Sequence, residues 1–153
     1  MRLSDILEEN NIIPDLKAKD KKGVLEELAE AIASRQPSLD KNSLVRVLLE
    51  RERLGSTGIG DGVAIPHGKF SGVMQPIISF GRSRKGLDFD SMDGEPAFLF
   101  FLLVAPENSA SIHLKALAKI AKILKNSAFR KVLMEAPNRH KLYETIVRND
   151  EEF

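Results

Sequence analysis

His67 closes a run from Arg51 to Gly68 in which five glycines and one proline surround a short apolar segment. We expect the apolar segment to be a strand that stops at the imidazole. Imidazole is the side chain that can be a neutral nucleophile near pH 7 and still accept a phosphoryl group on nitrogen. The residue types therefore predict that the chemistry of this protein takes place at His67. Taken in isolation, however, a histidine in such a turn is more often a surface residue than a catalyst.

Two further side chains could act together with this imidazole. Arg51 precedes His67 by 16 residues and could hold phosphate oxygens with its planar guanidinium. The alternative is that Arg51 only stabilises the end of its helix, because a cation in the last turn interacts favourably with the helix dipole. His113 follows the longest apolar run of the chain, near the start of a predicted helix, where α/β proteins tend to place their sites and where helix amides attract anions. A satisfied core histidine is the alternative for His113. We interpret His140 as solvated surface.

The glycines could instead form a nucleotide-binding loop, but their spacing argues against it. The sequence Gly58-Ile59-Gly60 continues as Asp61-Gly62-Val63, so the third glycine of the dinucleotide fingerprint is missing, and no P-loop motif follows. Glycines that serve turns or close backbone packing remain the structural alternative. Two histidines without a third ligand at a recognisable spacing predict no metal site.

The composition limits what kind of protein this can be. A chain of 153 residues with 42% hydrophobic residues suffices for one domain, residues 1–153, with a sizeable core. A net charge of +1 gives no argument for binding nucleic acid. The chain has no cysteine, no signal-like beginning, and no run of the roughly 20 apolar residues that a membrane span needs. We expect a soluble cytoplasmic protein without membrane insertion, and nothing implies a cofactor.

Apolar periodicity predicts helices and strands that are intermixed along the chain. The strongest strand, residues 97–105, is nine consecutive apolar residues, which indicates burial on both faces and helices on both sides of a sheet. Further strands are expected at 77–81 and 87–89, and residues 13–18 should be extended. Helices should begin near the polar residues Ser4, Asp20, Asp40, Asn108, Ser127 and Asn138. The pattern predicts an α/β fold, a three-layer α-β-α sandwich with a mixed central sheet of four to five strands.

The segment Gly55–Gly68 resembles the active-site signature of the enzyme IIA domains of the bacterial phosphoenolpyruvate:sugar phosphotransferase system, fructose/mannitol type (type 2). The beginning of the chain is most similar to the nitrogen-regulatory members of that family. The resemblance implies that Nε2 of His67 accepts a phosphoryl group from the phosphocarrier protein HPr. Arg51 and His113, in the pattern His-Leu-x-x-Leu, match the two other active-site residues of the family.

The resemblance also indicates which neighbouring residues could touch phosphate or a partner protein: Ser56, Thr57, Gly58 and Gly68. Ile59 and Phe70 are candidate apolar contacts in the transient interface. Asp61 departs from the asparagine that many nitrogen-type members have, and its carboxylate could repel a phosphohistidine by about 1 kcal/mol or less.

Three functions fit the resemblance. The first is a nitrogen-type regulator, a phosphotransferase whose partners depend on whether His67 is phosphorylated. The second is a sugar-transport enzyme IIA, which would pass the phosphoryl group to a cysteine of a separate enzyme IIB, because this chain has no cysteine. The third is a regulatory binding module that has lost phosphoryl transfer, and the joint presence of Arg51, His67 and His113 argues against it.

Overall fold

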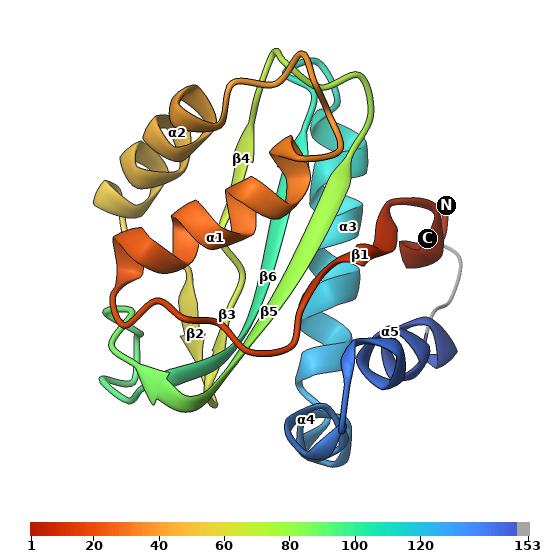
Figure 1. Ribbon diagram of the computed structural model, residues 1–153. Helices are drawn as coiled ribbons and strands as arrows, with labels where there is room; N and C mark the ends of the chain where they lie inside the picture. The colour runs from red at the N-terminus through yellow and green to blue at the C-terminus, as the bar shows by residue number, and fades with distance from the viewer. Residues whose placement is uncertain (150–153) are drawn as a thin grey trace.

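The apolar run Ala97–Ala105 forms β6, the central strand of a mixed sheet in the computed structural model, which describes residues 1–149 (Figure 1). The strand order is β1-β5-β6-β3-β2, and β4 also pairs with β6. Strands β5 and β6 are antiparallel, whereas β1 is parallel to β5, and β3 and β4 are parallel to β6. The other strands are β1 (Leu7–Ile13), β2 (Gly58–Gly60), β3 (Val63–Ala64), β4 (His67–Lys69) and β5 (Ile77–Leu87).

Strands β3 and β4 lie end to end along the same edge of β6. Val63 and Ala64 pair with the first half of β6, at Leu99 and Phe100, and β4 pairs with its last three residues. The six strand segments therefore make a sheet that is five strands wide, which confirms the predicted mixed sheet. This arrangement puts His67 beside Leu103, near the carboxyl end of the central strand.

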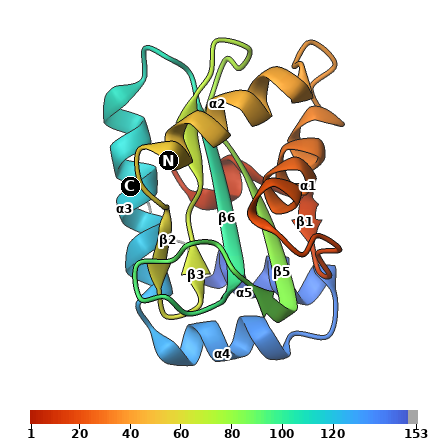
Figure 2. The ribbon, with the colours of Figure 1, turned by 90° about the vertical axis from the view of Figure 1, so that its left-hand side faces the viewer.

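Helices cover both faces of the sheet, as the continuous apolar run of β6 predicted. Figure 1 shows α1 and α2 on one side of the sheet and α3, α4 and α5 on the other, and Figure 2 shows the same layers after a quarter turn. Side chains of β6 alternate between two buried clusters: Leu99, Phe101 and Leu103 pack with α3–α5, and Phe100, Leu102 and Val104 with α1 and α2. The helices are α1 (Lys21–Ala33), α2 (Lys41–Arg53), α3 (Ala110–Leu124), α4 (Ser127–Glu135) and α5 (Arg139–Arg148).

Polar capping residues fix where four of the helices begin. The side chains of Asp20, Asp40, Asn126 and Asn138 each accept a hydrogen bond from a backbone N–H in the first turn of α1, α2, α4 and α5. Three of these caps were predicted as helix starts, and α4 begins at the predicted Ser127 with Asn126 as its cap. Helix α3 is different, because Ser109 at its N-cap makes no side-chain capping bond.

Three predictions about local structure were wrong. Instead of a helix from Ser4, the chain forms one 3-10 turn, Leu3–Asp5, and then strand β1. The strands predicted at 77–81 and 87–89 are one long strand, β5, which ends at Leu87. His67 does not end a strand but begins β4, because the regular strand pairing is interrupted at Ile65 and Pro66. There the Ile65 N–H donates to the Thr57 carbonyl, and the Pro66 carbonyl accepts from the Leu103 N–H of β6, while Pro66 itself has no N–H to donate.

Candidate active site

A pocket of about 440 Å³ lies where α2, β4 and the beginning of α3 meet. Arg51 comes from the last turn of α2, His67 from the start of β4, and His113 from the first turns of α3. The structure therefore brings together the three side chains that the sequence singled out. The lining residues are Arg51, His67, Gly68, Lys69, Ala110, His113, Leu114 and Leu117.

The imidazole of His67 is held by a backbone carbonyl. Its Nδ1 lies 2.8 Å from the carbonyl oxygen of Ile65. A carbonyl oxygen can only accept a hydrogen bond, so this contact places the proton of the neutral ring on Nδ1. The lone pair is then on Nε2, the other nitrogen of a side chain that lines the pocket. A neutral His67 in this geometry is a nucleophile at Nε2.

The surroundings of His67 keep it neutral at pH 7. Partial burial lowers its pKa below the ordinary histidine value, and the nearby charge of Arg51 lowers it further. The hydrogen bond to Ile65 and the charge of Glu52 act in the opposite direction, but the net effect on the pKa is a decrease. The ring therefore has an available lone pair under physiological conditions.

His113 stands edge-on to His67 across the pocket. The two ring centroids are 5.5 Å apart and the ring planes are at 87°. His113 is buried, and its Nδ1 has no hydrogen-bond partner among residues 1–149. Burial lowers the pKa of His113, as do the nearby His67 and Lys69. A neutral ring with its proton on Nε2 avoids burying an unpaired N–H donor, so His113 is best suited to donate a hydrogen bond from Nε2.

Gly68 lets helix α2 approach the strand that carries His67. A Cβ atom at this position would lie 3.2 Å from Cγ1 of Val47 and 3.4 Å from Cδ2 of Leu48. Val47 is one helical turn before Arg51, so the close contact between α2 and β4 brings the arginine to the pocket. The guanidinium of Arg51 donates through Nη1 to the carbonyl oxygen of Gly55 at 2.8 Å, which orients it at the end of the helix.

Replacing Gly68 by valine should therefore push α2 away from β4. We expect Gly68→Val to lower the free energy of unfolding by about 1–3 kcal/mol, the usual cost of overpacking a close contact. Gly68→Ala is the graded control, since one methyl group requires the Val47 and Leu48 side chains to move only slightly. Urea denaturation of the three proteins measures the difference. Equal stability of wild type and Gly68→Val would contradict the assigned packing.

Ser56, Thr57 and Gly58 do not line the pocket. The hydroxyl of Ser56 donates to the carbonyl of Phe89 at 2.8 Å and accepts from the backbone N–H of Gly58 at 3.0 Å. The backbone N–H and the hydroxyl of Thr57 are bonded to the carboxylate of Glu52. In this structure the polar groups of the three residues hold the loop after α2 together. Of the four predicted phosphate or partner contacts, Gly68 alone is part of the pocket lining.

The glycine-rich turn between β2 and β3 lies away from His67 along the sheet. Asp61 and Gly62 have positive φ values of 56° and 76° and form the two-residue turn between β2 and β3. Asp-Gly is a preferred sequence for such hairpin turns. Val63 and His67 pair with β6 residues four positions apart, a backbone separation of about 13 Å. Solvent ions screen charge over that distance, so the carboxylate of Asp61 has little effect at His67.

Two residues of the site were missed in the sequence. Lys69 lines the pocket and is exposed, and it follows His67 by two positions, which places both side chains on the same face of β4. That spacing could have identified it. Glu52 is buried behind the loop although a charged residue in a last helical turn normally faces solvent. Its spacing could have identified it, because Glu52 follows the buried Leu44 and Leu48 by eight and four residues, on the apolar face of α2.

Residues 5–149 match the protein family described as "Phosphoenolpyruvate-dependent sugar phosphotransferase system, EIIA 2". The chain belongs to this family. A nitrogen regulatory protein of Bradyrhizobium diazoefficiens is 40% identical over 146 residues, which are 95% of each chain. The crystal structure of nitrogen regulatory protein IIA-Ntr from Neisseria meningitidis has 35% sequence identity and a TM-score of 0.88, with 94% of this chain and 98% of that chain covered.

The chain is also similar to part of a larger sugar-specific protein. A fructose-specific EIIABC component of Bacillus subtilis is 35% identical over 150 residues, which are 98% of this chain but 24% of that protein. The chain therefore spans about a quarter of the length of that relative. The predicted family, and the predicted similarity to its nitrogen-regulatory members, are confirmed by these comparisons.

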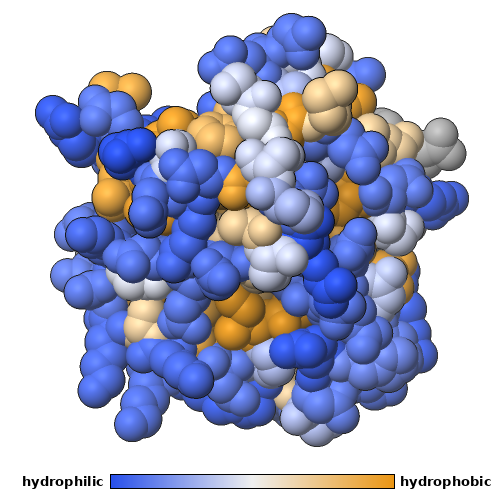
Figure 3. All heavy atoms as spheres, turned by 45° about the horizontal axis from the view of Figure 1, so that its top comes forward, coloured by the Kyte–Doolittle hydropathy of each residue, from blue (hydrophilic) through white to orange (hydrophobic). Residues whose placement is uncertain are grey.

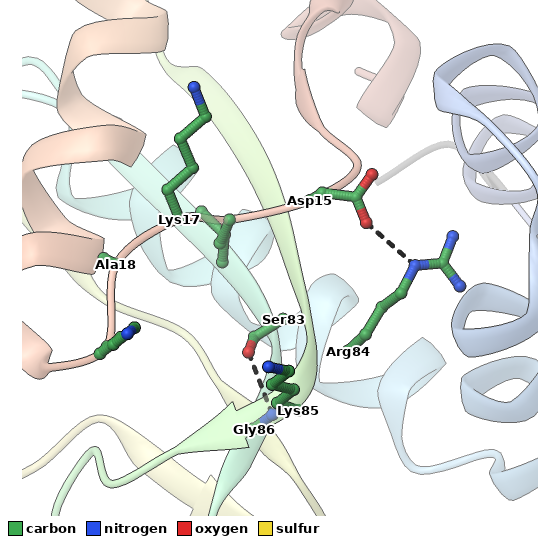
Figure 4. Close-up of a pocket in the computed structure, with 9 residues that line it drawn as sticks. Asp15, Lys17, Ala18, Ser83, Arg84, Lys85 and Gly86 are labelled. Carbon is green, nitrogen blue, oxygen red and sulfur yellow. Dashed lines mark hydrogen bonds and ion pairs between the residues drawn. The ribbon is translucent and has the colours of Figure 1, made fainter.

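A second hollow in this EIIA 2 protein lies at the other end of the sheet. It has a volume of about 540 Å³ and lies between residues 15–19 and the end of β5 (Figure 4). Arg84 points toward Asp15, with which it forms an ion pair of 2.9 Å, and Lys17 points away from Ser83. The cationic side chains thus diverge instead of converging on one ligand.

Two other features bear on the predicted class of this EIIA 2 protein. Within residues 1–149, no group of three or more histidine or acidic side chains could hold a metal ion. No helix in the same part of the chain has the length and apolar character required to cross a membrane.

Proposed function

We propose that this EIIA 2 protein accepts a phosphoryl group on Nε2 of His67 from the phosphohistidine of an HPr-like phosphocarrier. The main support is the hydrogen bond between Nδ1 of His67 and the Ile65 carbonyl, which leaves a lone pair on Nε2 in a pocket beside Arg51 and His113. The family supplies the reaction class, because its members are components of a phosphotransferase system.

The reaction exchanges one nitrogen–phosphorus bond for another. The Nε2 lone pair of His67 forms the new bond, and the donor imidazole keeps the electron pair of the bond that breaks. The transferred group is metaphosphate-like, so positioning and electrostatic stabilisation are the main tasks of the protein. Positive charge develops on the His67 ring during attack, and the Ile65 carbonyl is placed to stabilise it through the Nδ1 proton.

Cationic groups around the pocket are suited to the oxygens of the transferred phosphoryl group. Arg51 and Lys69 supply positive charge, and Nε2 of His113 supplies a hydrogen-bond donor. The first turn of α3 contributes backbone N–H groups near Ala110, since Ser109 does not cap them with its side chain. We propose that Gly68 contacts the phosphoryl group or the partner protein. Ser56, Thr57 and Gly58 would instead stabilise the loop after α2.

The pKa values of His67 and His113 should lie below the ordinary histidine value of 6.5, and the pKa of His140 should lie above it. Burial lowers the pKa of His67 and His113, so the titration midpoint of each ring should lie below pH 6.5. A hydrogen bond to Glu9 raises the pKa of His140, so this ring stays protonated above pH 6.5. NMR titration of the ring protons measures all three midpoints in one sample.

The neutral, competent form of His67 thus still predominates at pH 6.5, and the midpoint of the decline in phosphoryl acceptance should lie below that pH. Glu9→Gln is the control, because it should lower the midpoint of His140 and leave that of His67 unchanged. A His67 midpoint at or above that of His140 would contradict the assigned environment.

Exposed apolar side chains at the end of α2, on α3 and on β2 are available for contact with the donor. Leu114 on the rim of the pocket is 67% exposed, Leu54 at the end of α2 83% and Ile59 on β2 45%. Figure 3 shows the molecule with the top of Figure 1 tilted forward, and on that side apolar patches interrupt a mostly hydrophilic surface. Phe70, the other predicted contact, is half-buried against the α1–α2 core. We propose Ile59 and Leu114 as contacts in a small transient interface.

A nitrogen-type regulatory role suits this chain best. The 40% identity to the Bradyrhizobium protein, over nearly the full length of both chains, supports it. A phosphoryl group adds about two negative charges at His67, which can repel one partner and recruit another. Transfer to a separate enzyme IIB in sugar transport is the second candidate, favoured by the similarity to the fructose-specific protein. We propose that residues 1–153 act as one cytoplasmic domain in either role.

Phosphorylation with purified components tests the proposal. The protein is incubated with labelled phosphoenolpyruvate, enzyme I and HPr, and the site of labelling is read by phosphorus and nitrogen NMR. We expect one phosphoryl group on Nε2 of His67. No label in the presence of active HPr, or label on another residue, would disprove the proposal. Pull-downs with both forms then separate the two roles, since equal partner binding in both states would count against regulation.

A further inference from the structure

Glu52 is a buried carboxylate whose oxygens are fully engaged. Its side chain is 3% exposed, and its Oε1 lies 3.0 Å from Nζ of Lys21 on α1. The same oxygen accepts a hydrogen bond from the backbone N–H of Thr57 at 3.1 Å, and the other oxygen accepts one from the Thr57 hydroxyl. Burying a carboxylate is unfavourable unless it is paired and hydrogen-bonded, so this arrangement fixes Thr57 with respect to α2.

A chain of hydrogen bonds leads from Thr57 to the imidazole. The carbonyl oxygen of Thr57 accepts from the backbone N–H of Ile65 at 3.0 Å. The carbonyl oxygen of Ile65 in turn accepts from Nδ1 of His67 at 2.8 Å. Each bond fixes the group that makes the next one. The position of the Ile65 carbonyl therefore depends on where Glu52 holds Thr57.

The Ile65 carbonyl matters because it selects between two forms of a neutral histidine. With the acceptor in place, the proton stays on Nδ1 and Nε2 is free to attack. If the carbonyl moves away, the proton can occupy Nε2, and the ring can rotate. In that form His67 is not a nucleophile at the proposed atom.

We propose that Glu52 is a positioning residue for phosphoryl transfer, holding His67 in its Nδ1–H form through Thr57 and Ile65. The inference rests on the proposed function, and it adds a residue that does not line the pocket. Glu52 acts by the length of its side chain more than by its charge, since an amide of the same length can keep both contacts to Thr57. The amide oxygen accepts from the Thr57 N–H, and the amide NH2 donates to the Thr57 hydroxyl, which then acts as the acceptor.

Two conservative substitutions of Glu52 separate the effect of side-chain length from the effect of charge. Glu52→Gln keeps the length of the side chain and loses the charge, whereas Glu52→Asp keeps the charge and withdraws it from Thr57 by one methylene. The same pair of changes at Glu50, which is exposed on the same helix and paired with Arg53, serves as the matched control. Nitrogen–proton correlation spectra of the His67 ring report which nitrogen carries the proton, without any phosphoryl donor.

For Glu52→Asp we expect an Nε2–H form of His67 to appear and the initial rate of phosphoryl acceptance to fall about tenfold or more, since small misplacements of reacting groups are costly. Glu52→Gln should keep the Nδ1–H form and remain within about threefold of the wild-type rate. Its His67 pKa should decrease, because the negative charge that raises it is gone. Both Glu50 variants should behave as wild type in the spectra and the rate.

Two results would overturn the positioning role. One is an unchanged His67 ring in Glu52→Asp, and the other is a larger loss in Glu52→Gln than in Glu52→Asp, which would assign the effect to charge. If wild type accepts no phosphoryl group from active HPr, the proposed function fails. The ring spectra of the unphosphorylated variants still decide whether Glu52 orients His67, so the two failures are distinguishable.

Discussion

His67→Ala is expected to lose phosphoryl acceptance almost completely, by at least about 10³-fold, because the substitution removes the nucleophile itself. We do not expect His113 to replace His67 as the phosphoryl acceptor. His113 is buried, and among the described residues its Nδ1 has no hydrogen-bond partner and no carbonyl holds its proton on that atom. The initial rate of labelling from phosphorylated HPr measures the loss.

Variants of the neighbouring residues should give graded effects. Arg51→Ala and His113→Ala remove one stabilising group each, and we expect each to slow labelling about 10²-fold while leaving some acceptance. His140→Ala is the matched control, because this histidine is exposed and pairs with Glu9 on the other side of the molecule from α2. Labelling of His67→Ala at the wild-type rate, or loss of labelling in His140→Ala, would contradict the assignment of His67.

The largest expected loss of stability is at Arg82, a fully buried arginine on β5. Its Nε donates to the carbonyl of Pro14 at 3.0 Å, and its Nη1 donates to the carbonyls of Leu133 and Ala136 at 2.8 and 2.7 Å. These carbonyls belong to the end of α4 and to the chain after β1. Arg82→Met fills much of the space but leaves the buried carbonyls without donors, at about 1–3 kcal/mol each.

We therefore expect Arg82→Met to reduce the free energy of unfolding by about 3–5 kcal/mol. Arg84→Met is the control on the same strand, because Arg84 is exposed and its ion pair with Asp15 should contribute at most about 1 kcal/mol. Urea denaturation followed by circular dichroism measures both. Similar losses for the two variants would show that the carbonyl contacts of Arg82 have little influence on stability.

Local signals in the sequence predicted the elements that carry the site. The apolar run of β6 gave its bounds directly, and the capping residues Asp20, Asp40 and Asn138 gave the starts of α1, α2 and α5. The sequence of β1, Leu-Glu-Glu-Asn-Asn-Ile-Ile, has no strand alternation, and its pairing partner β5 is some 70 residues away. Such a strand is stabilised by long-range pairing, which local periodicity does not reveal.

The sequence predicted which side chains form the candidate site, but it did not predict the hydrogen bonds that orient them. His67, His113 and Arg51 have side chains whose types alone suggest phosphoryl chemistry, and the fold brings them to one pocket. The proton position on His67 depends on the Ile65 carbonyl, a backbone group that the residue types do not mark. The place of Glu52 on the apolar face of α2 agrees with its burial, but its contact with Thr57 depends on how the loop after α2 folds back, which is again a tertiary effect.

The two buried clusters on opposite faces of the sheet have a consequence for the dynamics of the pocket. Arg51 belongs to the layer of α1 and α2, and His113 to the layer of α3–α5, with β4 between them. A phosphoryl group that contacts both side chains links the local opening of one layer to that of the other. Amide hydrogen exchange in α2 and in the first turns of α3 should then slow together on phosphorylation, because the phosphoryl group would connect the two helical layers at the edge of the sheet.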